Sequence, residues 1–122
     1  LEVMARALEA DLDAFGVLSL GAKQPAKISS LCTVFAESEV ISLIAKGETR
    51  ENIIAGIHEA IAARVSAMAS RIGLAAPVMM TGGVARNVGV VRALEKELGM
   101  TIAVSPLAQL TGAIGAAAIA RE

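Results

Sequence analysis

The single cysteine, Cys32, lies in the stretch SSLCTVFAESEV, directly before a predicted helix. Because the N–H groups and the dipole at a helix N-terminus favour an anion, a thiol there is suited to a thiolate that acts as a nucleophile or as a metal ligand. A nucleophile needs a nearby base, and the only histidine, His58, is distant in sequence. A cluster ligand needs partner thiols, which a symmetry-related second copy could supply. The alternative is a buried thiol that packs as a small apolar side chain.

A second candidate is the pair Gly82 and Gly83 in VMMTGGVARN. Residues 77–81 are predicted to form a buried strand, and ligands of parallel sheets collect at the carboxyl ends of the strands, where glycine lets the backbone approach them. The pair therefore predicts a nucleotide contact, with a plain strand-to-helix turn as the alternative. Neither G-x-x-x-x-G-K-[ST] nor G-x-G-x-x-G occurs, so a nucleotide would be held by another design.

Other polar and sulfur-bearing residues are predicted to be structural. His58 lies off the apolar stripe of its helix and is expected to be solvated, since a lone histidine lacks the partners of a metal site. Met79 and Met80 are expected to fill the core from a strand. Glu37 and Glu39 fall early in a helix, where negative charge offsets the helix dipole.

The apolar spacing of the first part predicts mainly helices. The expected elements are a helical stripe over residues 1–15 that ends at Gly16, a short strand over 27–30, a helix capped by Thr33 and stopped by Gly47, and a helix of about six turns from Thr49 to Gly73.

Residues 74–122 predict strand, helix, strand, helix. The strands are 77–81 and 100–104, both expected to be buried, and the helices are 88–98 and 109–120. Short apolar strands that alternate with helices favour parallel pairing. On the last helix Gly112, Gly115 and Ala116 share one face, which predicts close packing against a helix or sheet, or a contact at a hinge. The whole chain is interpreted as one α/β domain, mainly helical over residues 1–73.

Composition excludes several classes of protein. The chain is 55% hydrophobic and 2% aromatic, with a net charge of −1 and no basic run, which is poor material for a nucleic-acid surface. One cysteine excludes an internal disulfide framework. No signal peptide is visible, and glycines and a proline interrupt the uncharged run 98–120, so we expect a cytoplasmic protein with no membrane partner. The chain opens inside a helical pattern without Met, and we interpret it as a piece of a longer protein.

Four segments together resemble the activator ATPases of 2-hydroxyacyl-CoA dehydratases, a family that includes the ATP-hydrolysing subunits of benzoyl-CoA reductase. They are SSLCTVFAESEVISLIAKG, IIAGIHEAIAARV, MMTGGVARNVGVVRALEKELG and SPLAQLTGAIGAAAIA, in the order and spacing of the family. The resemblance covers essentially all 122 residues and implies the C-terminal part of an actin-like, two-lobed ATPase, helix-rich with a few short parallel strands.

The resemblance also implies a function. Family members use ATP or ADP with Mg²⁺, hold a 4Fe–4S cluster between two subunits, and drive its electron into a partner dehydratase or reductase that acts on a CoA thioester. A second copy or a paralogous ATPase subunit, a ferredoxin or flavodoxin donor and an anaerobic cell are implied too. Cys32 matches a cluster ligand, Gly82 and Gly83 match the adenosine-binding pair, and Thr81 and Asn87 are weaker candidates beside it.

The chain also departs from the family pattern. The loop like C-A-A-G-T-G with the second cluster cysteine is absent, as are the phosphate loops with the acidic residues that manage Mg²⁺ and water. We therefore expect the isolated chain neither to hydrolyse ATP nor to hold a normal cluster. The alternatives are a kinase-like, nucleotide- or sugar-binding member of the same fold, or a packing and dimerisation module.

Overall fold

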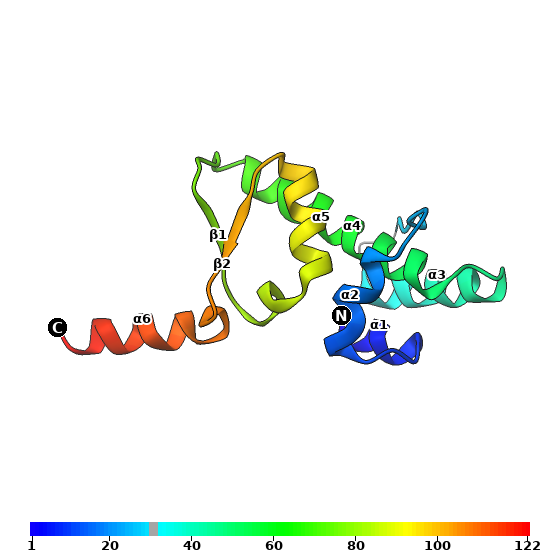
Figure 1. Cartoon of the computed structure of the whole chain (residues 1–122), viewed down its shortest axis with the longest axis horizontal. Coiled ribbons are helices and arrows are strands. Elements are labelled where there is room, and N and C mark those ends of the chain that lie inside the picture. The colour runs from blue at the N-terminus through cyan, green and yellow to red at the C-terminus, as the bar shows by residue number, and fades with distance from the viewer. Residues whose placement is uncertain (30–31) are drawn as a thin grey trace.

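The computed structural model describes residues 1–29 and 32–122 of the chain. In these ranges it contains six α-helices, two 3₁₀ turns and one sheet of two strands (Figure 1). The elements are α1 (Glu2–Ala7), α2 (Leu12–Leu20), α3 (Thr33–Ala45), α4 (Arg50–Ser70), β1 (Val78–Met80), η1 (Gly83–Arg86), α5 (Val88–Leu98), β2 (Ile102–Val104), η2 (Ala108–Leu110) and α6 (Thr111–Ala120).

The first twenty residues form two helices, so the single stripe predicted over residues 1–15 is wrong. The chain breaks at Glu9, whose φ of 51° lies in the left-handed region. Asp11 then begins α2, because its carboxylate accepts a hydrogen bond from the N–H of Asp13 at 3.1 Å. Gly16 lies inside α2 and does not end it.

The starts of α3 and α4 lie within one residue of the predicted ones. Cys32 has extended backbone and is the N-cap of α3, so Thr33 is the first helical residue and not the predicted cap. Thr49 caps α4 as predicted, its hydroxyl accepting from the N–H of Asn52 at 3.3 Å. Of the strand expected over 27–30, residues 27–29 form none and Ser30 lies outside the described residues.

The main core lies where α1, α2, α3 and α4 meet. Its buried members are Met4, Ala5, Leu8, Phe15, Val40, Ile53, Ile54 and Ile57. Helix α4 is buried only in its first part, since Val65 and Met68 near its end are exposed. By length and composition α4 could cross a membrane, but that criterion also fits core helices, and here α4 packs against α2 and α5.

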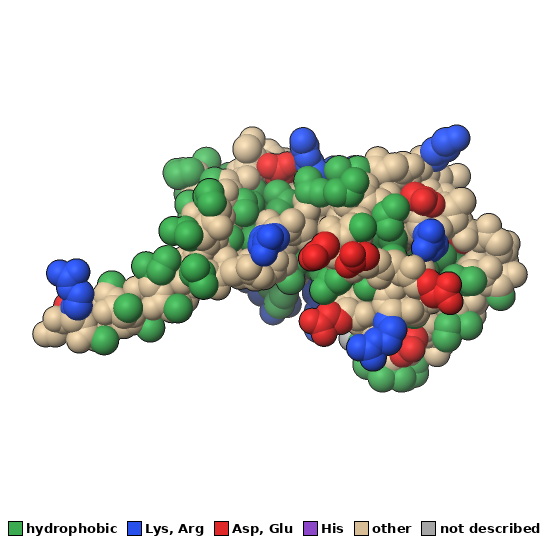
Figure 2. All heavy atoms as spheres, turned by 60° about the horizontal axis from the view of Figure 1, so that its bottom comes forward, with side chains coloured by type: hydrophobic (Ala, Val, Ile, Leu, Met, Phe, Trp, Pro, Cys, Tyr) green, Lys and Arg blue, Asp and Glu red, His purple; other side chains and the backbone are tan. Residues whose placement is uncertain are grey.

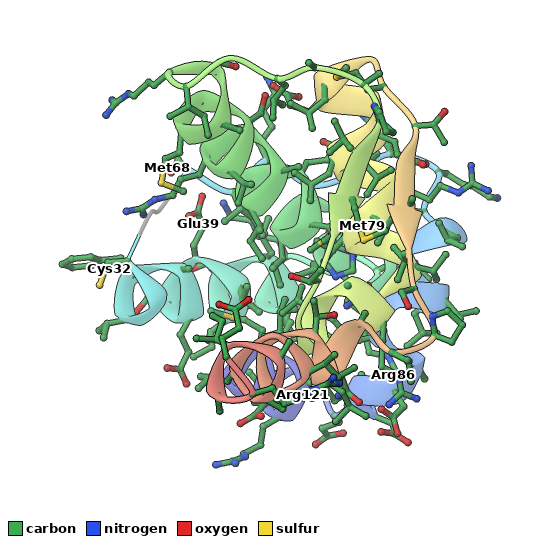
Figure 3. The ribbon with its side chains drawn as sticks, turned by 90° about the vertical axis from the view of Figure 1, so that its left-hand side faces the viewer. Cys32, Glu39, Met68, Met79, Arg86 and Arg121 are labelled. Atoms are coloured by element: carbon green, nitrogen blue, oxygen red, sulfur yellow. The ribbon has the colours of Figure 1, made fainter. Side chains whose placement is uncertain are left out.

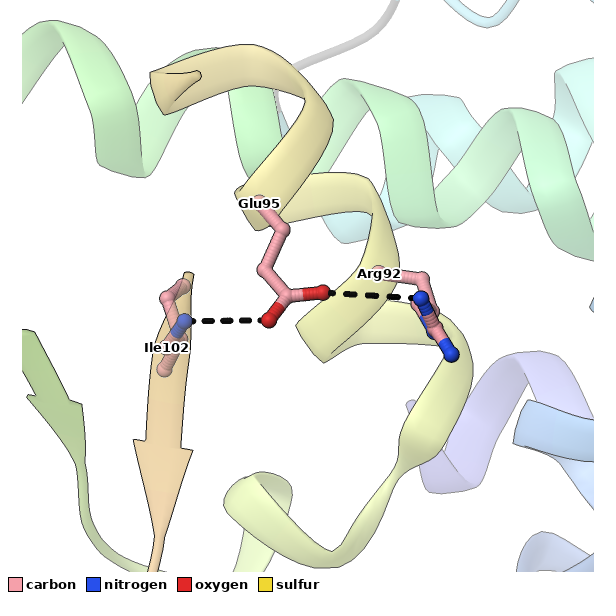
Figure 4. Close-up of polar contacts among 3 residues, drawn as sticks. All are labelled: Arg92, Glu95 and Ile102. Atoms are coloured by element: carbon pink, nitrogen blue, oxygen red, sulfur yellow. Dashed lines mark hydrogen bonds and ion pairs between the residues drawn. The ribbon is translucent and has the colours of Figure 1, made fainter. Parts of the chain in front are cut away.

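The second part is a small α/β unit. Asn87 caps α5 by accepting from the N–H of Val90, and Gly99 ends the helix with a left-handed φ of 66°. On α5, Glu95 accepts a hydrogen bond from the N–H of Ile102 at 3.0 Å and lies 4.0 Å from Arg92 (Figure 4). The same carboxylate therefore fixes where β2 begins relative to α5.

The two strands pair in parallel as predicted, with Met79 opposite Ala103. The prediction that they are buried is wrong, because the residues that the structure describes leave one face of the sheet exposed. Val78, Met80 and Ile102 face the second core of Ala62, Val90 and Leu94. Met79 points to the other side and is 61% exposed, so it does not fill the core (Figure 3).

Helix α6 projects from the body and ends at the C-terminus (Figures 1 and 2). Every residue of α6 is exposed. A Cβ added at Gly112 or Gly115 would meet no atom within 4 Å. The close packing predicted for this glycine face is therefore absent among the described residues.

Glycine is required where α2, α4 and α5 converge. A Cβ on Gly89 of α5 would overlap the hydroxyl of Ser19 on α2 and the ring of His58 on α4. A Cβ on Gly16 of α2 would overlap the amide of Asn87. These glycines allow the helix backbones to approach closely.

We expect Gly89→Ala to lower the free energy of unfolding by about 1–3 kcal/mol, because the added methyl group overpacks this junction. Gly21→Ala is the matched control. Gly21 has a φ of −82°, and its Cβ would lie 3.5 Å from the nearest atom. We expect the control to be neutral or up to about 1 kcal/mol more stable. Urea unfolding measures the stability of both variants. Equal effects of the two substitutions would contradict the conclusion that the junction requires glycine at position 89.

Candidate nucleotide cavity and the exposed thiol

A cavity of about 840 Å³ opens at the carboxyl ends of β1 and β2. The turns that follow these strands, η1 and η2, form one wall, and α1 and α2 form the other. Its lining includes both apolar and polar residues: Leu1, Glu2, Val3, Leu12, Asp13, Gly83, Val84, Arg86, Asn87 and Gln109. This volume and mixture are typical of small-molecule sites.

The predicted adenosine contacts are only partly brought together. Gly83 and Asn87 line the cavity, whereas Thr81 and Gly82 are not among the described lining residues. Gly82 has a different task, because its N–H donates to the carbonyl of Ala108 at 2.8 Å with a φ of 92° that favours glycine. It joins the turn after β1 to the turn after β2.

Arg86 and Gln109 were not predicted as site residues. The guanidinium of Arg86 donates to Oε1 of Gln109 at 2.9 Å, across the two turns on the cavity wall. The sequence contains a feature that could have pointed to each of them. Arg86 lies within GGVARN, and Gln109 follows the second strand, whose carboxyl end must meet that of the first in a parallel sheet.

His58 is buried, 1% exposed, so the prediction that it is solvated is wrong. It lies off the apolar stripe because it faces polar partners inside the fold. Its Nδ1 is 3.1 Å from the hydroxyl of Ser19, and its Nε2 is 3.4 Å from Nδ2 of Asn87. The ring of Phe15 packs against it edge-on, with 5.5 Å between the ring centroids.

The partners of His58 assign its tautomer. Ser19 donates its only hydroxyl hydrogen to the carbonyl of Gly16 at 2.7 Å, so Nδ1 of His58 must carry a hydrogen and donate to Ser19. Asn87 uses Oδ1 to accept from Val90, so its Nδ2 donates to Nε2 of His58. Each atom has one consistent role when the imidazole is neutral. Burial lowers the pKa of His58 to about 4, in agreement with this arrangement.

We expect stability to fall as the pH is lowered from 7 towards 5. Because the pKa of His58 falls from 6.5 to about 4 on folding, the unfolded chain binds a proton in this range that the folded chain does not. The loss is about 2 kcal/mol between about pH 7 and pH 5. Urea unfolding of the wild type and of His58→Gln at both pH values measures it. A decline of the same size in the variant would contradict this origin.

Cys32 lies apart from the cavity. Figure 3 shows it at one end of α3, pointing outward, with Arg86 of the cavity wall on the other side of the view. The thiol is exposed, so the alternative of a buried apolar cysteine is wrong. Val34 and Phe35 beside it are also exposed. Among the described residues no three His, Cys, Asp or Glu side chains form a metal-binding group.

Glu39 of α3 holds Ser29 by two kinds of hydrogen bond. Its carboxylate accepts from the N–H of Ser29 at 3.0 Å and from the hydroxyl of Ser29 at 3.1 Å. The first turn of α3 contains no acidic residue, so neither Glu37 nor Glu39 is placed to offset the dipole there as predicted.

Comparison with known proteins identifies the family of this chain. Residues 1–120 match the BadF/BadG/BcrA/BcrD ATPase family. The chain belongs to this family. It is 53% identical over 122 residues to the activator of lactoyl-CoA dehydratase of Anaerotignum propionicum, covering 100% of the chain and 47% of that protein. It is 52% identical over 117 residues to the (R)-2-hydroxyglutaryl-CoA dehydratase activating ATPase of Acidaminococcus fermentans, covering 96% of the chain and 45% of that protein.

A solved structure of the family confirms the predicted fold class. The activator of the 2-hydroxyisocaproyl-CoA dehydratase from Clostridium difficile, with bound ADPNP, superposes with a TM-score of 0.91 at 49% identity, covering 95% of this chain and 43% of that one. The chain is thus a helix-rich part of an actin-like ATPase with two short parallel strands. It spans less than half the length of these relatives.

Proposed function

We propose that the full-length protein carrying this chain is an ATP-dependent, electron-transferring activator of a 2-hydroxyacyl-CoA dehydratase or of benzoyl-CoA reductase. The single observation that carries the proposal is the cavity at the carboxyl ends of β1 and β2, in a chain half identical to a relative with bound ADPNP. The proposal assigns the adenosine of ATP or ADP to this cavity, with Gly82, Gly83, Thr81 and Asn87 as its turn.

The residues present fit a nucleotide. The backbone at Gly83 is open, because a Cβ there would come no closer than 3.6 Å to Gln109. Arg86, Asn87 and Gln109 offer hydrogen bonds, and the apolar lining residues suit a purine face. The Mg²⁺ and phosphate sites belong to the part of the family pattern that this chain lacks. The isolated chain is therefore proposed to be inactive as an ATPase.

We expect Gly83→Asp in the full-length protein to weaken ADPNP binding by at least about ten-fold, since its side chain would occupy space in the cavity that the proposal assigns to the adenosine. Gly83→Ala is the control, because its methyl group fits at ordinary contact distance and should leave the fold unchanged. Titration calorimetry measures the dissociation constants. Unchanged binding by the Asp variant would place the nucleotide elsewhere.

The proposal further assigns Cys32 as a ligand of a 4Fe–4S cluster on a two-fold axis. The donor is right in kind, because the thiol is exposed at a helix N-terminus among exposed apolar side chains. The set of ligands is incomplete, because two copies of this chain supply only two of the four thiolates that the cluster needs. The others must come from outside these residues. Such a cluster supplies one-electron transfer at low potential.

We expect Cys32→Ser to abolish the cluster signal of the full-length protein reconstituted anaerobically with iron and sulfide, because the cluster loses a thiolate from each subunit. EPR and visible spectra report the cluster. Ala45→Ser, which adds a hydroxyl at the other end of α3, is the control and should keep the signal. An unchanged signal in the Cys32 variant would remove Cys32 from the cluster.

The remaining partners follow from this activity. A second copy or a paralogous ATPase subunit completes the cluster, and a ferredoxin or flavodoxin supplies its electron. The dehydratase or reductase accepts the electron and acts on the CoA thioester in the cytoplasm of an anaerobic cell. Relatives that are about half identical to this chain over the matched residues are dehydratase activators, which favours a dehydratase as the partner.

A further inference from the structure

His58 lies at the one point where α2, α4 and α5 meet. Both ring nitrogens are used inside the protein, Nδ1 by Ser19 and Nε2 by Asn87. No buried side-chain polar atom of the described residues lacks a partner. The imidazole therefore belongs to a closed set of hydrogen bonds that joins three helices.

Asn87 is the member of this set that reaches the cavity. Its Oδ1 accepts from the N–H of Val90 and its Nδ2 donates to His58, while Gly16 leaves room for the amide. A flipped amide would oppose donor to donor at Val90 and acceptor to acceptor at His58. His58 thus selects one orientation of Asn87.

That orientation also sets the turn on the cavity wall. Asn87 directly follows η1, whose first residue, Gly83, lines the cavity with it. Asn87 also donates its own N–H to the carbonyl of Val84 within the turn. Fixing the side chain of Asn87 through His58 therefore also fixes the backbone of the turn that lines the cavity.

We infer that His58 is a positioning residue of the nucleotide site, whose Nε2 holds Asn87 and thereby the turn from Gly82 to Asn87 in the conformation that binds adenosine. The inference rests on the proposed function. His58 touches no ligand and acts only through Asn87. A polar set of this kind stabilises little more than apolar packing does, but it specifies one geometry, which is what a binding turn requires.

Two substitutions of His58 distinguish the hydrogen bond made by Nε2 from the one made by Nδ1. The amide of Gln reaches the position of Nε2, so His58→Gln can still accept from Asn87. The amide of Asn reaches only the position of Nδ1, so His58→Asn keeps the contact with Ser19 and loses the contact with Asn87. Both variants keep a buried amide and should lose similar stability.

The experiment measures ADPNP binding to the full-length protein by titration calorimetry, with urea unfolding in parallel. We expect His58→Asn to bind ADPNP about ten-fold more weakly and His58→Gln to bind within about two-fold of the wild type. Ile53→Val, a core change away from the cavity, controls for lost stability and should bind normally. Equal losses in both His58 variants, or no loss in His58→Asn, would overturn the inference.

A measurement on the unchanged protein covers the case in which a variant fails to fold. Long-range ¹⁵N–¹H NMR spectra of the imidazole should show His58 neutral with the hydrogen on Nδ1. A hydrogen on Nε2 would overturn the inference, because that nitrogen could not accept from Asn87. If the wild type fails to bind ADPNP, the proposed function fails. If it binds and His58→Asn binds equally well, only the role of His58 fails.

Discussion

The close approach of α2, α4 and α5 around His58 is the constraint on which the rest of the structure depends. Gly16 and Gly89 provide the space, and the hydrogen bonds of His58 determine how the helices are turned. Helix α4 carries this junction between the two cores, with Ile53 and Ile57 in the first and Ala62 in the second. Without the junction, fewer contacts would fix the orientation of the helical part relative to the α/β part.

The same arrangement connects the candidate nucleotide cavity with the exposed Cys32, which lies apart from it. The cavity is bounded by α1, α2 and the turns after the strands, whereas Cys32 begins α3. Val40 of α3 packs in one core with Phe15 of α2 and Met4 of α1. Protein interiors are close-packed, so a displacement of the α1–α2 wall is resisted by the helix that carries the thiol. The core that stabilises the fold is also the physical link between the cavity and the thiol.

Much of this could be predicted from the sequence, because capping residues and glycine stops act locally. Thr49 begins a helix and Gly99 ends one where local chemistry requires it, and the parallel pairing follows from the order of elements. Some failures are local, such as the break at Glu9 and the capping of α3 by Cys32 instead of Thr33. The others are tertiary. The burial of His58 depends on Ser19 and Asn87, which are distant in sequence, and the exposure of Met79 depends on a sheet face that the described residues leave uncovered. Residue type alone could not reveal either.

Helix α6 is the element that the rest of this chain does least to support. It has ten residues, none buried, and a helix of that length is marginal in water without tertiary contacts. Its helix–coil equilibrium would therefore shift towards helix if an apolar surface covered Ile114 and Ile119. The backbone amide hydrogens of α6 would then exchange more slowly with solvent.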